Sequence, residues 1–137
     1  MIIGIKQGKC DIYGYTSREI AEKLKQVDRK TTSVETISRK IRRLQNTGEI
    51  IYGYQFYTVD EINCNLIAIH KNQIVAIANS SKELSRLLIK KAIISNSNTE
   101  TVRRSICKVI DTNRTYYECF IISLQMKPVE TRTLIGS

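Results

Sequence analysis

The segment at residues 35–44 constrains the fold most, because a closely related segment follows it 65 positions later, at residues 100–109. The flanks continue the similarity at an offset of 64, where TSREIAEKL from Thr16 aligns with SSKELSRLL from Ser80. The identical pairs in the first alignment are Glu35/Glu100, Thr36/Thr101, Arg39/Arg104 and Ile41/Ile106. We therefore interpret the chain as one unit of about sixty residues that occurs twice.

Each unit is predicted to contain two helices, and each helix is preceded by the pattern Ser/Thr-x-x-Glu. In such a capping box the hydroxyl accepts from the N–H three residues on, while the Glu reaches back to the cap residue. Apolar residues then recur at helical spacing, so Ile37 and Ile41, like Val102 and Ile106, are predicted to be buried. The four expected boxes are Thr16/Glu19, Thr32/Glu35, Ser80/Glu83 and Ser97/Glu100.

The sequence also predicts a strand pair before the helices and one strand after them. In the first unit these are apolar runs at residues 2–5 and 10–13 and a tyrosine-rich run at 50–59, matched in the second unit by 115–124. This order, found twice, predicts an α+β fold of tandem duplicated winged helix-turn-helix units. The expected first unit, linker, second unit and C-terminal tail are residues 1–59, 60–65, 66–124 and 125–137.

The chain is strongly basic, since 22 Lys and Arg against 13 Asp and Glu give a formal net charge of +9. Such a surplus on a small protein favours an anionic partner, most often nucleic acid. The alternative is a basic surface without a specific partner.

The sequence favours a non-enzyme without a metal or cofactor. The four cysteines form no Cys-x-x-Cys pair and His70 is the only histidine, which argues against tetrahedral zinc. No nucleophile–base pair, Gly-rich phosphate loop or carboxylate cluster is recognisable. Because no signal peptide and no apolar run near eighteen residues is visible, we expect a cytoplasmic protein with no membrane partner.

The second helix of each unit carries the candidate DNA-binding residues. With Ile37 and Ile41 facing the core, helical geometry points Arg39 and its neighbours outward. Hydroxyls and N–H groups at a helix N-terminus can meet a phosphate, and the planar fork of Arg can bond guanine O6 and N7 together. Glu35 and Glu100 are assigned to capping. The candidates are Thr32, Ser33, Thr36, Arg39, Arg42 and Arg43 in the first unit, and Asn98, Thr99, Thr101, Arg103, Arg104 and Lys108 in the second.

The second unit contains four short motifs that together form a recognisable pattern. They are VAI at residues 75–77, SSKELS at 80–85, NTETVRR at 98–104 and a tyrosine pair at 116–117. The pattern resembles the nuclease-associated modular DNA-binding domains of homing endonucleases and the winged helix-turn-helix regulators of phages and mobile elements. The resemblance implies that the second helix contacts DNA, through Thr101, Arg103 and Arg104. The pattern departs at residues 90–96, where the turn between the helices is longer.

These features predict a sequence-specific double-stranded DNA-binding transcriptional regulator with two recognition helices, acting as a repressor that occupies an operator. Arg39 and Arg104 occupy equivalent positions, so a tandem or inverted pair of half-sites is expected. An alternative is a phage or mobile-element inhibitor or adaptor that binds another protein or a ribonucleoprotein machine, with autoregulatory DNA binding. RNA binding is a third, favoured if the tyrosines rather than the arginines are exposed. A homodimer is compatible with each.

Overall fold

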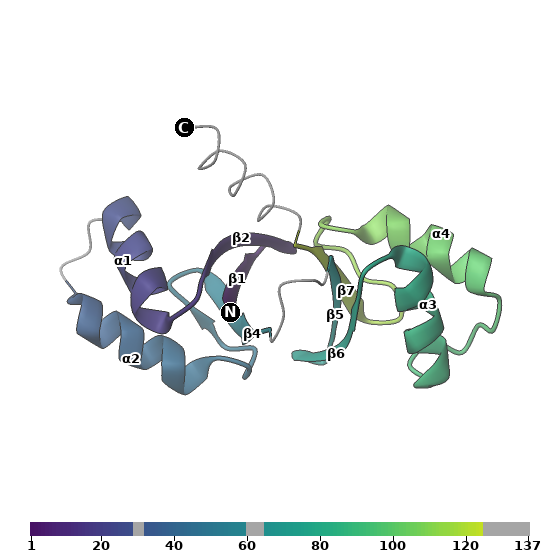
Figure 1. Cartoon of the computed structure of the whole chain (residues 1–137), viewed down its shortest axis with the longest axis horizontal. Coiled ribbons are helices and arrows are strands. Elements are labelled where there is room, and N and C mark those ends of the chain that lie inside the picture. The colour runs from purple at the N-terminus through teal and green to yellow at the C-terminus, as the bar shows by residue number, and fades with distance from the viewer. Residues whose placement is uncertain (29–31, 60–64, 125–137) are drawn as a thin grey trace.

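Figure 1 shows a molecule with a pair of helices at each end and β-strands between them. The computed structural model describes residues 1–28, 32–59 and 65–124. Most of the expected linker and the whole expected C-terminal tail lie outside these residues, so both stay predictions. The described residues form an α+β fold with two antiparallel sheets and four helices.

The two halves of the chain have nearly the same order of elements. The first half comprises β1 (Ile2–Lys6), β2 (Lys9–Gly14), α1 (Ser17–Asp28), α2 (Val34–Leu44), β3 (Ile50–Ile51) and β4 (Tyr54–Thr58). The second half comprises β5 (Leu66–His70), β6 (Gln73–Ala78), α3 (Ser81–Lys90), α4 (Thr99–Val109) and β7 (Cys119–Ser123). The strand order is β2-β1-β4-β3 in the first sheet and β6-β5-β7 in the second.

The run at residues 50–59 is a hairpin rather than the single strand predicted. Its strands β3 and β4 pair antiparallel across Tyr52 and Gly53, whose φ angles of 55° and 87° are left-handed. Gly adopts this conformation without strain, which permits a tight reversal. In the second half the reversal also takes two left-handed residues, Tyr117 and Glu118, but the paired stretch is shorter, because only an isolated bridge between Tyr116 and Cys119 precedes β7.

Alternation along the strands gives each sheet two buried faces. In β1, Ile2 packs with the first helix pair, whereas Ile3 and Ile5 pack against the other sheet. In β5, Leu66 likewise packs with the second helix pair, and Ile67 packs against the first sheet. Successive side chains point to opposite faces of a strand, so a continuous apolar run places apolar side chains on both faces of the sheet. The central cluster between the sheets consists of Ile3, Ile5, Tyr57, Val59, Ile67, Ile69, Ile122 and Leu124.

Two close backbone approaches join the halves beside the central cluster. A Cβ added to Gly8 would collide with the backbone of Asn113, and one added to Gly48 would collide with the side chain of Asn72. In the alignment of the halves, Gly8 corresponds to Asn72 and Gly48 to Asn113. The contact of Gly8 with Asn113 and that of Gly48 with Asn72 therefore involve the same pair of aligned positions, with the two halves in exchanged roles. This reciprocity is typical of an isologous interface. The halves are related by an approximate two-fold axis along the viewing direction of Figure 1.

Local hydrogen bonds recur at corresponding places in the two halves. The main-chain N–H of Thr58 donates to Asn46 Oδ1 at 2.9 Å, and that of Ser123 donates to Asp111 Oδ1 at 2.9 Å. Each β-hairpin that opens a half also has an irregular register at the same position of its first strand. The halves thus share backbone geometry as well as sequence.

The capping boxes expected for α1 and α3 are confirmed. The N–H of Glu19 donates to Thr16 Oγ1 at 3.1 Å, and the N–H of Glu83 donates to Ser80 Oγ at 3.2 Å. Each Glu carboxylate reaches back one residue further than expected, and accepts from the N–H of the residue before the cap. These bonds satisfy donors that a helix N-terminus would otherwise leave free.

The boxes expected for α2 and α4 are wrong by one residue. Ser33 caps α2, where its Oγ accepts from the N–H of Thr36 at 3.2 Å. Asn98 caps α4, where its Oδ1 accepts from the N–H of Thr101 at 3.1 Å. Ser33 and Asn98 are at least as favourable at the N-cap position as the residues that precede them. The capping-box pattern alone could therefore not identify the cap residue. Glu35 is therefore not a capping residue.

The connection between the helices is longer in the second half, as the sequence predicted. It spans residues 91–98, where the first half has 29–33. Ile94 within it is only 2% exposed and packs into the core below α3 and α4. The N–H groups of Ile93 and Ile94 donate to the carbonyl of Leu88, which holds the longer turn against α3.

The predicted core positions Ile37, Ile41, Val102 and Ile106 are all buried, with 0% exposure. We expect Ile41→Ala to lower the free energy of unfolding by about 2–5 kcal/mol, because it leaves a cavity beneath α2. Ile50→Ala is the matched control, since Ile50 is 68% exposed and surface truncations usually change stability by about 0.5 kcal/mol or less. Urea unfolding followed by circular dichroism measures both. Equal effects would show that the assigned phase of α2 is wrong.

The packing of the two halves is tested by a pair of glycines. Gly8 and Gly53 have φ angles of 78° and 87°, but a Cβ on Gly53 would meet nothing within 4 Å. Gly53→Ala should cost about 1–2 kcal/mol for the left-handed backbone alone. Gly8→Ala should cost about 1–3 kcal/mol more, because it also forces apart the contact with Asn113. Equal losses in urea unfolding would contradict the close approach of the halves.

Candidate nucleic-acid interface

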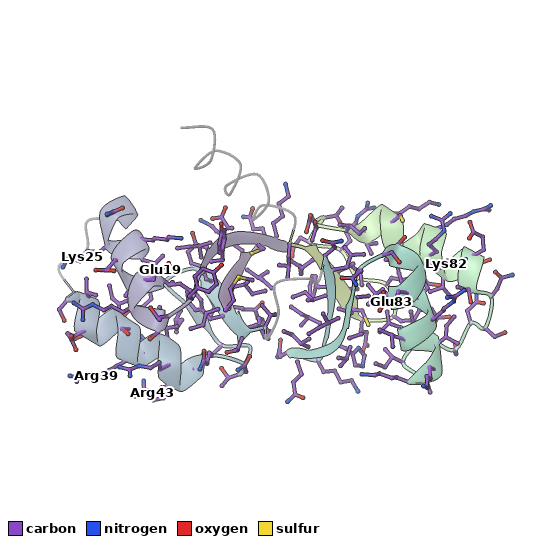
Figure 2. All side chains as sticks on the ribbon, in the orientation of Figure 1. Glu19, Lys25, Arg39, Arg43, Lys82 and Glu83 are labelled. Carbon is purple, nitrogen blue, oxygen red and sulfur yellow. The ribbon has the colours of Figure 1, made fainter. Side chains whose placement is uncertain are left out.

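The helix α2 presents an exposed basic face on the side opposite its buried residues. Figure 2 shows Arg39 and Arg43 extending from α2 away from the body of the molecule. The expected outward direction of Arg39, Arg42 and Arg43 is confirmed, since all three are exposed. The face surrounds an open hollow of about 700 Å³. We call it the α2 surface, which consists of Thr36, Arg39, Lys40, Arg42 and Arg43.

The charge of the α2 surface is not compensated. Glu35, the nearest carboxylate in sequence, accepts from Arg18 Nη1 on α1 at 2.8 Å. Both side chains are largely exposed, so this pair contributes little stability, but it holds Glu35 on the side of α1. Among the described residues, no carboxylate pairs with Arg39 or the other cations of the surface. The surface can therefore offer four positive charges to an anionic partner.

The hydroxyls of Ser33 and Thr36 are engaged in the cap of α2. Ser33 Oγ lies 3.0 Å from Thr36 Oγ1, in addition to the bond from the Thr36 N–H. The carbonyl of Thr32 accepts from Lys25 Nζ at 2.9 Å, and Thr32 itself is half-buried. Of the three predicted residues, only Thr36 borders the hollow lined by the arginines.

The β3–β4 hairpin adjoins the α2 surface. Lys40 Nζ lies 5.3 Å from the ring centroid of Tyr52, a cation–π distance. Tyr52 sits in the turn of the hairpin, so the turn and the exposed face of α2 form neighbouring parts of one surface. Sequence reasoning did not include Lys40 or Tyr52 in the site. Lys40 was recognisable in principle, because it follows Thr36 by four residues and so shares its helix face.

The helix α4 presents the corresponding face, which we call the α4 surface. It consists of Thr101, Arg103, Arg104, Cys107 and Lys108. All of them are exposed except the partly buried Arg103. Asn98 is the cap of the helix, and Thr99 is its half-buried first residue. Cys107 stands where α2 has Arg42, and Ser105 stands where α2 has Lys40.

Glu100 compensates part of the charge on the α4 surface. Arg103 donates to both carboxylate oxygens, at 3.1 and 2.5 Å, and Arg104 Nε lies 3.5 Å from one of them. The hydrogen bond from Arg103 lowers the pKa of Glu100, followed by the positive charges of both arginines. The predicted capping role of Glu100 is wrong, because the carboxylate is engaged within the surface itself. The α4 surface is thus less basic than the α2 surface.

Comparisons of the chain with protein-family models, with curated proteins and with solved structures found no match. In the part of the chain that the structure describes, no group of His, Cys, Asp and Glu could hold a metal ion. No helix in the same residues has the length and apolar character needed to cross a membrane. The two basic surfaces are therefore the candidate functional site of the protein.

The cysteines give a chemical test of these assignments. Cys107 is exposed on α4, whereas Cys119 is buried and burial raises its pKa to about 11. At pH 8 only about a thousandth of a thiol with such a pKa is thiolate, the reactive form. We expect iodoacetamide at pH 8 to modify Cys107 rapidly and Cys119 only after unfolding in guanidinium chloride, as read by peptide mass spectrometry. Equal rates in the native protein would contradict the assigned faces of α4 and β7.

Proposed function

We propose that this protein is a sequence-specific double-stranded DNA-binding transcriptional regulator that acts as a repressor by occupying an operator. It consists of two winged helix-turn-helix units, with α2 and α4 as recognition helices and the β3–β4 hairpin as the wing of the first unit. The observation that carries the proposal is the α2 surface. Its four cations lie on one exposed helix face with no paired carboxylate among the described residues.

The geometry of α2 suits duplex DNA better than duplex RNA. A helix with its side chains is about 10–12 Å across, which matches the major groove of B-DNA at about 12 Å. The major groove of A-form RNA is too deep and narrow for side chains to read. Arg39 and Arg43, which are four residues apart on one face, can address base edges, while Lys40 and Arg42 beside them contact phosphates.

A protein-binding role is the second candidate, and one specific feature favours it. An open cavity of about 600 Å³ lies at the junction of the halves. Apolar side chains from both sheets line it, including Ile50, Ile69 and Phe120. An inhibitor or adaptor protein could use such a cavity to hold a side chain of another protein. Lys6 and Lys71 also line it, so it is not the isolated apolar patch that would give this role preference.

Selection of bound sites from random duplex DNA tests the proposal directly. A recovered consensus and an affinity that falls steeply with salt concentration are expected, because phosphate contacts release counterions. No consensus together with a flat salt dependence would contradict DNA binding and favour the second candidate.

Arg39→Ala should then weaken binding to the selected site by about 1–3 kcal/mol and relax specificity at one base pair, as expected for loss of a bidentate guanine contact. Lys82→Ala is the matched control. It removes the same charge from the start of α3, in the other half of the molecule. Both affinities are measured by fluorescence anisotropy with the selected duplex and with single-base variants of it. Equal effects of the two substitutions on every duplex would show that Arg39 reads no base.

A further inference from the structure

We infer that one molecule binds two DNA segments at once, one on the α2 surface and one on the α4 surface, and thereby bridges them. The inference rests on the proposed DNA-binding function and adds the arrangement of the bound DNA. It follows from the directions in which the two surfaces face, from the rigidity of the junction between the halves, and from the stiffness of DNA.

The two surfaces lie on opposite edges of the molecule. In Figure 1, α2 is at the lower edge of one end and α4 at the upper edge of the other, as the approximate two-fold axis requires. Figure 2 shows Arg39 and Arg43 extending beyond the lower edge. Arg104 occupies the position of Arg39 in the repeat and is 72% exposed. A half-turn about the axis reverses every direction that lies in the plane of the view, so the α4 surface faces the opposite way.

The junction between the halves prevents the surfaces from turning to a common side. The central cluster contains side chains from both sheets, among them Ile3 and Tyr57 of the first and Ile67 and Ile122 of the second. All four are at most 1% exposed. Rotating one half against the other would expose this apolar area to water, at about 1.5–3 kcal/mol for each large side chain. The halves are therefore expected to move as one body.

One straight duplex cannot reach two opposed edges. DNA has a persistence length of about 50 nm, and a smooth bend of 40–90° over 20–30 base pairs already costs about 1–6 kcal/mol. A duplex that left the α2 surface and returned along the α4 surface would have to bend by more than this. A second duplex, or a distant segment of the same DNA joined by a loop, meets the α4 surface without that cost. The two surfaces then hold separate segments of DNA.

The two surfaces are expected to differ in strength. On the α4 surface, Arg103 is held by Glu100, which leaves Arg104 only partly compensated and Lys108 exposed. Arg114 lies next to the end of the helix, where its Nη2 donates to the carbonyl of Lys108 at 3.1 Å. This set suits phosphates more than base edges, because it lacks the group of free arginines found on α2. The α2 surface therefore selects the sequence, and the α4 surface holds the second segment.

A two-duplex capture experiment tests the inference with the full chain. A duplex carrying the selected site is fixed to beads, protein is added, and retention of a second, fluorescent duplex is measured. The wild-type protein should retain the second duplex. A variant with Arg104→Ala and Lys108→Ala should still bind one duplex in a mobility-shift assay. The amount of the second duplex that it retains should be lower by a factor of about ten or more. The matched control combines Lys82→Ala with Lys90→Ala, two exposed residues of α3, and should retain it as the wild type does.

The outcomes separate this inference from the function on which it rests. If the wild type shifts one duplex but retains no second, bridging is wrong while DNA binding stands. If the Arg104/Lys108 variant still retains the second duplex, bridging arises from self-association of two molecules and the inference is overturned. If no duplex is shifted at all, the proposed function fails, and this inference fails with it.

Cys107 supplies an independent measurement, because it lies within the α4 surface. Excess duplex should slow its alkylation by iodoacetamide several-fold in the wild-type protein, as read by peptide mass spectrometry. The Arg104/Lys108 variant should lose this protection while its α2 surface remains bound. Unchanged reactivity of Cys107 in the wild type, with the mobility shift complete, would show that the α4 surface is not occupied by DNA and would overturn the inference.

Discussion

The packing of the two sheets face to face is the interaction on which the rest of the structure depends. Each sheet carries apolar side chains on both faces. With only its own helix pair, each sheet would therefore expose one apolar face to water. Ile3 and Ile67 meet in the central cluster, where each buried side chain contributes about 1.5–3 kcal/mol. The Tyr57 hydroxyl is buried there without a hydrogen-bond partner among the described residues, and burial raises its pKa. Such a group costs about 1–3 kcal/mol, which the surrounding apolar contacts offset.

That packing also decides where the functional surfaces lie. Since the inner faces of the sheets are covered by each other, the helices can pack only on the outer faces, at the two ends of the molecule. The approximate two-fold axis, marked by the paired contacts of Gly8 with Asn113 and of Gly48 with Asn72, then places α2 and α4 on opposite edges. A buried apolar interface between the sheets thus sets the direction in which the arginines point.

The two halves have similar backbones but differ in charge. In both halves the main-chain N–H near the end of a strand, of Thr58 or Ser123, donates to the side-chain oxygen of the equivalent residue, Asn46 or Asp111. On the second helices the carboxylates correspond in sequence, yet Glu35 pairs with Arg18 across to α1, whereas Glu100 pairs with the arginines of its own helix. Position 18 is Arg where the repeat has Lys82. One carboxylate therefore leaves the α2 surface fully charged, and the other neutralises part of the α4 surface.

The sequence by itself determined the similarity of the two halves, the phase of α2 and α4 and the outward direction of Arg39, because these depend on periodicities that neighbouring residues impose locally. It placed the caps of α2 and α4 one residue early, since adjacent Ser, Thr and Asn are all favourable cap residues and the capping pattern alone does not choose between them. It missed the turn at Tyr52, and it could not tell whether the two basic faces share one side. Tertiary structure alone decided that last point. The relative direction of two helices depends on contacts between the two halves, such as that of Gly8 with Asn113, and no local pattern encodes it.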